Sequence, residues 1–221
     1  VEMEVDRLIE EASDRLLDRL GDDDDVTELV SKFSAQQMGD DKDWRIQRDL
    51  HAKGKLLFQE QHRVHLQRLA EIAPTDFLSS IQRVQSRREA LAKITKTGVQ
   101  NLYDMVQRHG EGPADFPRSS FPNWLEKHRT LRYAADLDML TEDKGEVTYR
   151  VQWLQKGIEN GDWLNKKAPE SDRVWIEEHG AELSQRLLKL LEHYREDVRL
   201  SLYARNLYGV AVLSLLDQAL E

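Results

Sequence analysis

The stretch that decides the fold runs from Phe121 to Gln152 and reads FPNWLEKHRTLRYAADLDMLTEDKGEVTYRVQ. Its apolar residues follow helical spacing as far as Leu140 and change to strict alternation after Gly145. The helical positions are Trp124, Leu125, His128, Leu131, Ala134, Ala135 and Met139, and the alternating ones are Val147, Tyr149 and Val151. The stretch therefore predicts a helix, a charged turn and a short β-hairpin near 141–152.

Helical patterns also cover most of the remaining chain, because apolar residues recur at spacings of three and four. Gly21 and Gly110 are suited to helix C-termini and Pro74 ends a long helical stretch, whereas Asp22 to Asp25 precede a helix whose free N–H groups they can cap. We prefer capping to metal binding there, since adjacent side chains diverge. The predicted helices are 2–20, 26–38, 44–72, 77–96, 99–108, 153–159 and 172–221, with loops at 39–43, 111–122 and 166–171.

These patterns predict a mainly α fold, a helical bundle with an embedded winged-helix-like unit. We expect three regions: 1–97, an acidic arm followed by a basic helical hairpin; 98–165, the winged-helix-like unit; and 166–221, a C-terminal helical region. The segment Leu207 to Leu216 is apolar on nearly every face, which predicts either a core helix or a helix covered by a partner.

Composition bounds the class of protein. The chain has 221 residues, 33% of them charged and 39% apolar, which is typical of a soluble, helix-rich protein. It has no cysteine, which excludes disulfides, thiol nucleophiles and cysteine-based metal sites and favours an intracellular, cytoplasmic setting. No apolar run approaches the roughly twenty residues of a membrane span, and the acidic N-terminus does not look like a signal peptide.

The net charge of −9 is distributed unevenly along the chain. Residues 1–43 hold 15 acidic and 5 basic side chains, whereas residues 44–100 hold 5 acidic and 11 basic ones. Two interpretations follow: the two parts neutralise each other inside the fold, or the basic part binds an anionic partner.

Residues 99–160 resemble winged helix-turn-helix proteins, with 99–108 as the first helix, the residues after Phe121 as later helices and 141–152 as the wing. In DNA-binding members of that group a recognition helix carries basic residues into the major groove. The resemblance implies that role for Lys127, Arg129 and Arg132, with Arg118 on the preceding loop and Lys144 or Arg150 at the wing. Because residues 101–160 contain 10 acidic and 8 basic side chains, a protein partner is the alternative.

The predicted basic helical hairpin is a second candidate for nucleic-acid binding. Five basic side chains fall within fourteen residues, and such a face would bind phosphates without sequence preference. The alternative is a solvated helix face paired with the acidic arm. The five residues are Arg83, Arg87, Arg88, Lys93 and Lys96.

Two weaker patterns concern chemistry. His62 and His65 are three residues apart, near Glu60 and His51, but no further ligands follow at a recognisable spacing, so we expect no metal site and no cofactor. Arg186 and His193 are separated by six residues, which resembles the Arg-x(4–6)-His pattern of helical HEPN ribonucleases. That resemblance implies a catalytic arginine and histidine acting on RNA at a dimer interface.

The chain lacks a phosphate-binding glycine loop, a dinucleotide fingerprint, a paired-histidine metalloprotease motif and a serine nucleophile elbow. We therefore expect a non-enzymatic DNA-associated or adaptor subunit of a larger assembly, which binds nucleic acid through a basic face, a partner protein through the winged-helix-like unit, or both. The alternatives are a metal-independent HEPN-like ribonuclease and a purely structural oligomerisation module. A protein partner or a second copy is expected, and a membrane is not.

Overall fold

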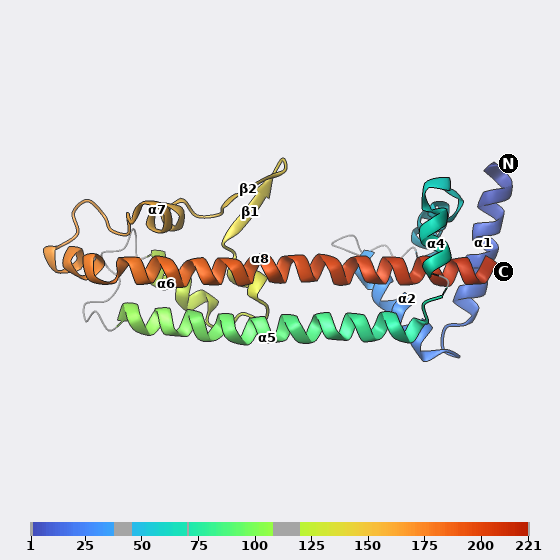
Figure 1. The fold of residues 1–221 in the computed structure, drawn as a ribbon, viewed down its shortest axis with the longest axis horizontal. Helices are drawn as coiled ribbons and strands as arrows, with labels where there is room; N and C mark the ends of the chain where they lie inside the picture. The colour runs from blue at the N-terminus through green and yellow to red at the C-terminus, as the bar shows by residue number, and fades with distance from the viewer. Residues whose placement is uncertain (1, 38–45, 70, 108–119, 221) are drawn as a thin grey trace. The chain divides into compact units, whose positions relative to one another are not determined.

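The computed structural model describes residues 2–37, 46–69, 71–107 and 120–220. These residues form a mainly α structure with one two-stranded antiparallel hairpin, as the sequence predicts (Figure 1). The elements are α1 (Glu2–Asp18), α2 (Asp24–Gln37), α3 (Ile46–Gly54), η1 (Lys55–Phe58), η2 (Glu60–His62), α4 (Arg63–Leu69), α5 (Pro74–Gln107), α6 (Ser120–His128), η5 (Ala134–Leu137), β1 (Leu140–Asp143), β2 (Glu146–Tyr149), α7 (Gln152–Asn160) and α8 (Glu170–Leu220).

The chain divides into two compact units. Unit 1 consists of Val1–Gln85 together with Ser201–Glu221, and unit 2 consists of Ser86–Leu200. The long helices α5 and α8 contribute residues to both units. The three regions expected from the sequence have other boundaries and stay a prediction about domains.

The N-terminal helices lie where the sequence predicts, although α1 ends and α2 begins two residues earlier than expected. Gly21 follows α1 with a left-handed backbone (φ +93°), a conformation that glycine adopts at little cost. Asp23 precedes α2, and its Oδ1 accepts a hydrogen bond from the N–H of Val26 at 3.1 Å. That bond, with help from Arg19, lowers the pKa of Asp23. The expected capping is thus confirmed at Asp23.

The prediction of one long helix over 44–72 is wrong. The described part of this segment is divided into α3, two 3₁₀ turns and α4, and Gln59 between the turns is extended. At the end of α3, a Cβ atom at Gly54 would stand 2.5 Å from Ile9 Cγ2, so α3 approaches α1 closely through a residue without a side chain. The helical hairpin expected from 44–72 and 77–96 is therefore not formed as predicted.

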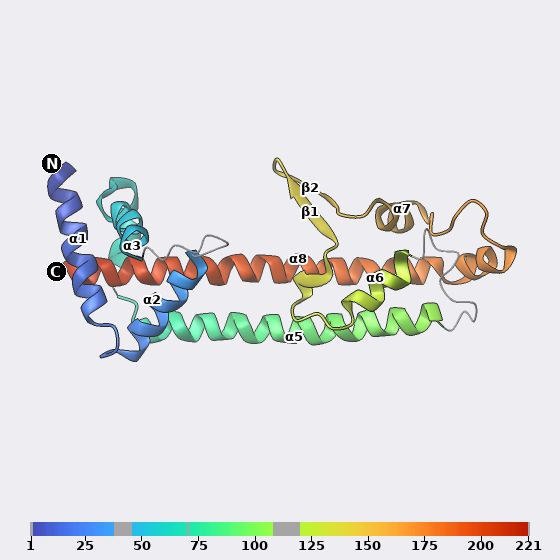
Figure 2. The ribbon, with the colours of Figure 1, turned by 180° about the vertical axis from the view of Figure 1, so that it is seen from behind.

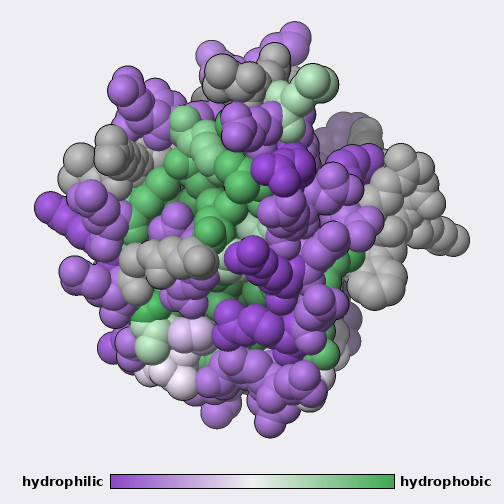
Figure 3. Space-filling view, turned by 90° about the vertical axis from the view of Figure 1, so that its right-hand side faces the viewer, coloured by the Kyte–Doolittle hydropathy of each residue, from purple (hydrophilic) through white to green (hydrophobic). Residues whose placement is uncertain are grey.

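The apolar end of α8 is covered within unit 1. Its side chains share a core with α1, α2 and the start of α5. Figure 3 shows one face on the side of α1 and the C-terminus, where an apolar area is bordered by hydrophilic residues. Within the described ranges no helix is long and apolar enough to cross a bilayer. The buried α8 residues in this core are Tyr208, Ala211, Val212, Leu215 and Leu216.

In unit 2 the helices α5 and α8 lie side by side (Figures 1 and 2). The separate helices expected at 77–96 and 99–108 are wrong, because α5 is continuous through Gly98. A Cβ atom there would stand 2.8 Å from Leu190 Cδ2, so this glycine serves close helix packing rather than a break. The shared core includes Val99, Leu102, Val106, Phe121, Leu125, Leu154, Trp163, Leu183, Leu187 and Leu191.

The predicted hairpin is confirmed, but the helix before it is shorter than expected. The register pairs Leu140 with Tyr149 and Thr141 with Thr148. The helix α6 ends at His128 instead of continuing to Leu140. The carboxylate of Asp136 accepts the backbone N–H groups of Arg132 at 3.1 Å and Tyr133 at 2.8 Å, which turns the chain into η5.

Several expectations lie outside the described residues. They are the break at 39–43, the start of a helix at Trp44, the stop at Gly110, nearly all of the loop at 111–122 and the role of Arg118.

Gly157 in α7 gives the first prediction. A Cβ atom at this position would overlap the indole ring of Trp163, which is buried and cannot move aside. We expect Gly157→Ala to lower the free energy of unfolding by about 1–3 kcal/mol, measured by urea denaturation, although alanine favours helix. Gly180→Ala in α8 is the control: its nearest side-chain atom, Ile176 Cγ2 at 3.2 Å, can shift. Equal stability of both variants would contradict this account of Gly157.

Candidate nucleic-acid interface

The contacts between α5 and α8 in unit 2 run in opposite directions along the two helices. Arg87 contacts Glu196, Thr95 contacts His193, and Gly98 approaches Leu190. The two helices are therefore antiparallel here, and residues from both can line one surface.

A buried ion pair holds the two helices together. Arg88 Nε donates to Asp197 Oδ1 at 2.6 Å, and the Asp197 side chain is fully buried. The backbone N–H of Ala135 donates to Asp197 Oδ2 at 2.9 Å, and the guanidinium of Arg88 lies 4.2 Å from the ring centroid of Tyr133. One carboxylate thus joins α5, α8 and η5.

The five basic residues expected to form one face play different parts. Arg83 belongs to unit 1 and donates to Ser80 Oγ, Arg88 pairs with the buried Asp197, and Arg87 pairs with Glu196 at 2.8 Å. Lys93 and Lys96 are exposed. The acidic partners of Arg87 and Arg88 come from α8 and not from the acidic arm.

The acidic arm does pair with the basic region at one place in unit 1. Asp6 Oδ1 lies 3.4 Å from Lys55 Nζ and 3.2 Å from His51 Nε2. Neutralisation between these two parts of the sequence is therefore confirmed at Asp6.

The residues expected on a recognition helix do not share one helix. Lys127 is in α6, whereas Arg129 and Arg132 follow its end. Arg129 donates to Gln100 and to Glu126 and lies over the ring of Tyr103, and Arg132 lies over Tyr133. Lys127 Nζ is 3.9 Å from Asp138 Oδ2. Each cation already has a partner in the chain, which disfavours phosphate binding here.

His128, at the end of α6, is a core residue. Its Nδ1 lies 2.6 Å from the carbonyl oxygen of Trp124, and the two rings pack with centroids 4.6 Å apart. Burial lowers the pKa of His128, although the contact with the Trp124 carbonyl opposes this. The ring therefore favours the neutral form and serves packing.

The hairpin tip is acidic. Lys144 (φ +53°) and Gly145 (φ +84°) form the two-residue turn, and both have the positive φ values of a type I′ hairpin. Glu142, Asp143 and Glu146 flank Lys144 in the sequence, and Arg150 at the base pairs with Asp138 at 2.6 Å. This balance of charge is unsuited to a wing that contacts DNA phosphates.

A basic pocket opens between α5 and α8 in unit 2. Its volume is about 450 Å³, and most of its lining surface is formed by apolar atoms of the residues around it. Among the described residues, three cationic side chains and a histidine line it, and none of these lining residues is acidic. The lining residues are Lys93, Ile94, Thr97, Gly98, Asn101, Arg186, Lys189, Leu190 and His193.

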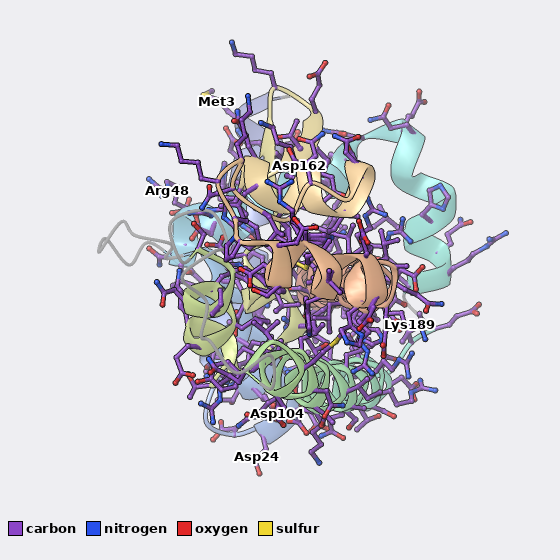
Figure 4. The ribbon with its side chains drawn as sticks, turned by 90° about the vertical axis from the view of Figure 1, so that its left-hand side faces the viewer. Met3, Asp24, Arg48, Asp104, Asp162 and Lys189 are labelled. Atoms are coloured by element: carbon purple, nitrogen blue, oxygen red, sulfur yellow. The ribbon has the colours of Figure 1, made fainter. Side chains whose placement is uncertain are left out.

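A second pocket, of about 620 Å³, adjoins the first and shares Asn101 and Arg186 with it. We call it the aromatic pocket because Trp175 and His179 pack there with ring centroids 4.9 Å apart. Asp104 on α5 and Lys189 on α8, one from each pocket, are labelled in Figure 4. The aromatic pocket is lined by Asn101, Asp104, Met105, Trp175, His179, Glu182 and Arg186.

The structure brings Arg186 and His193 to one pocket. Arg186 Nε donates to Glu182 Oε1 at 2.9 Å, and His193 Nδ1 lies 3.5 Å from Oγ1 of the buried Thr95. The sequence interpretation missed Lys189, which lies three residues after Arg186 and four before His193. That spacing alone places it on the same helix face.

Metal ligands do not gather in the part of the chain that the structure describes. No group of three or more histidine, aspartate and glutamate residues is arranged there to hold an ion. The side chain of His62, one of the weighed histidine pair, lies outside the described side chains.

The buried ion pair gives the second prediction. Asp197→Asn removes the charge that balances Arg88, whose side chain is only 16% exposed. We expect a loss of about 3–5 kcal/mol in the free energy of unfolding, measured by denaturant titration. Glu196→Gln is the matched control at the neighbouring position, where the pair with Arg87 is half exposed and is worth less than about 1 kcal/mol. Similar losses in the two variants would contradict the central role of Asp197.

Comparison with known proteins identifies no relative: no family model, no curated protein and no solved structure matches the chain. The winged-helix resemblance and the HEPN-like pattern therefore stay predictions.

Proposed function

We propose that unit 2 binds nucleic-acid phosphates in the basic pocket, as the nucleic-acid-associated subunit of a larger assembly. One observation carries the proposal: in a chain of net charge −9, three cationic side chains and a histidine line a pocket, and no acidic residue is among the described residues that line it. A phosphate backbone is an extended polyanion that such a pocket attracts.

The charge available to a ligand comes mainly from two lysines. Arg186 shares its charge with Glu182. By contrast, no ion pair of Lys93 or Lys189 is present within the described ranges. These two side chains come from different helices, so they would contact phosphates from both sides of the pocket. Binding of this kind is sequence-tolerant and weakens with salt.

The β1–β2 hairpin supports the adaptor part of the proposal. Its tip is acidic, and Val147 on β2 is 62% exposed. A large exposed apolar side chain among carboxylates suits a basic protein surface better than DNA. The hairpin would then recruit the partner while the basic pocket holds the nucleic acid.

The third prediction tests the pocket. Lys189→Glu should weaken binding to fluorescently labelled DNA and RNA several-fold and reduce the slope of log affinity against log salt by about 1. The readout is fluorescence anisotropy across a salt series. Lys156→Glu, at an exposed position on α7, is the control for the same change in net charge.

Two results would contradict the proposal: no salt-dependent nucleic-acid binding by the unsubstituted protein, or equally weakened binding in Lys189→Glu and Lys156→Glu. Charge reversal at Arg88 is unsuitable as a test because it would disrupt the buried pair with Asp197.

The shared pocket of Arg186 and His193 favours a second candidate function, metal-independent RNA cleavage. Histidine can exchange a proton near neutral pH, and arginine can bind the phosphate. His193 would take the proton of a ribose 2′-hydroxyl as its oxygen bonds to phosphorus. The bond from phosphorus to the 5′ oxygen then breaks, and that oxygen takes a proton from water. The products are a 2′,3′-cyclic phosphate and a 5′-hydroxyl end.

The fourth prediction follows from this chemistry. Cleavage of labelled RNA should persist in excess chelator, should spare DNA, which lacks the 2′-hydroxyl, and should fall at least a hundredfold in His193→Ala. His65→Ala, at an exposed position in unit 1, is the control, and circular dichroism checks folding. Cleavage that survives His193→Ala, or that needs a metal ion, would remove this candidate and leave phosphate binding as the function.

A further inference from the structure

We infer that the aromatic pocket receives an unpaired nucleobase beside a phosphate held in the basic pocket, so that the preferred ligand of unit 2 is single-stranded nucleic acid. This inference rests on the proposed function, because it needs a phosphate backbone in the basic pocket.

The two pockets form a continuous site. Asn101 and Arg186 line both of them, so a ligand can pass from one to the other without leaving these side chains. Along α8 the site extends from Trp175 to His193, a distance of about 27 Å at 1.5 Å per residue. That length accommodates several nucleotides, and Arg186 stands within it.

The chemistry of the site changes from one pocket to the other. In the part of the chain that the structure describes, lysines and no carboxylates line the basic pocket, whereas Asp104 and Glu182 line the aromatic pocket. Carboxylates repel phosphates, but they accept hydrogen bonds from the amino groups of bases. Asn101 offers both a donor and an acceptor at the junction. The distribution of charge thus matches a backbone at one end and a base at the other.

The apolar groups of the aromatic pocket suit a base as well. Trp175 and Met105 line it, and the ring of His179 packs against Trp175 at a tilt of 59°. Proteins that bind single strands without sequence preference combine a positively charged groove with aromatic side chains on which the bases stack. A base inside a duplex offers neither its faces nor its pairing edge, so only an unpaired base can enter.

The fifth prediction separates base recognition from phosphate binding. The probes are a labelled single strand, a strand of equal length with abasic sites throughout, and the corresponding duplex, in DNA and RNA forms, at one low salt concentration. We expect the unsubstituted protein to bind the intact single strand about tenfold more tightly than the abasic strand, and more tightly than the duplex.

Variants assign the preference to the pocket. Trp175→Ala should bring the affinity ratio of intact to abasic strand close to 1, and Trp175→Phe should retain most of it because phenylalanine still stacks. Lys189→Glu should weaken binding of both strands by the same factor and leave their ratio unchanged.

Equal affinity of the unsubstituted protein for intact and abasic strands would overturn the inference while leaving the proposed function standing. Tighter binding of the duplex would do the same. Absence of binding to all three probes would overturn the proposed function itself. The comparison of probes needs no substitution, so it stays decisive even if Trp175→Ala fails to fold.

Discussion

Arg88 and Asp197 place opposite charges where neither is well hydrated, and unit 2 is arranged around that contact. Removing a carboxylate from water is costly, and here the cost is offset by hydrogen bonds from the Arg88 guanidinium and from the N–H of Ala135. These donors come from α5 and from η5, whereas the carboxylate belongs to α8. The pair therefore fixes the register of two antiparallel helices and anchors the segment that leads into the hairpin.

That register decides which cations remain for a ligand. Since Arg88 pairs with Asp197 and Arg87 pairs with Glu196, the arginines of this part of α5 serve the fold. Between one and two turns further along α5, Lys93 lines the same pocket as Lys189 and His193, and none of the described lining residues is acidic. This division of roles suits the chemistry of arginine and lysine. The planar guanidinium of arginine matches a fixed carboxylate, whereas the lysine amine is a strongly hydrated charge on a flexible stem.

How far the sequence predicts this structure depends on whether a feature is local. The hairpin was predictable because alternation and the Lys144-Gly145 turn are short-range signals, and the capping by Asp23 is equally local. The roles of Gly98 and Gly54 were not predictable. A glycine that ends a helix and a glycine that allows close packing look identical in the sequence until the positions of Leu190 and Ile9 are known. The same holds for the site. Helix spacing places Arg186, Lys189 and His193 on one face of α8, but only the packing of α5 on α8 brings Lys93 to the same pocket. Arg83, which was expected on the same basic face as Lys93, belongs to unit 1.

Unit 1 is assembled from two segments that are far apart in the sequence. Arg15 Nη1 donates to the carbonyl of Ala219 at 2.9 Å, and Ser214 Oγ donates to the carbonyl of Leu69 at 3.0 Å. On the ribosome, the contiguous unit 2 can become complete while the core partners of Ala12 and Leu16 in residues 201–220 are still unmade. Until then, apolar faces of the N-terminal helices stay uncovered. Nascent chains with such exposed surfaces aggregate or bind chaperones. Synthesis of residues 201–220 of α8 then completes the core to which residues 1–85 contribute the other side chains.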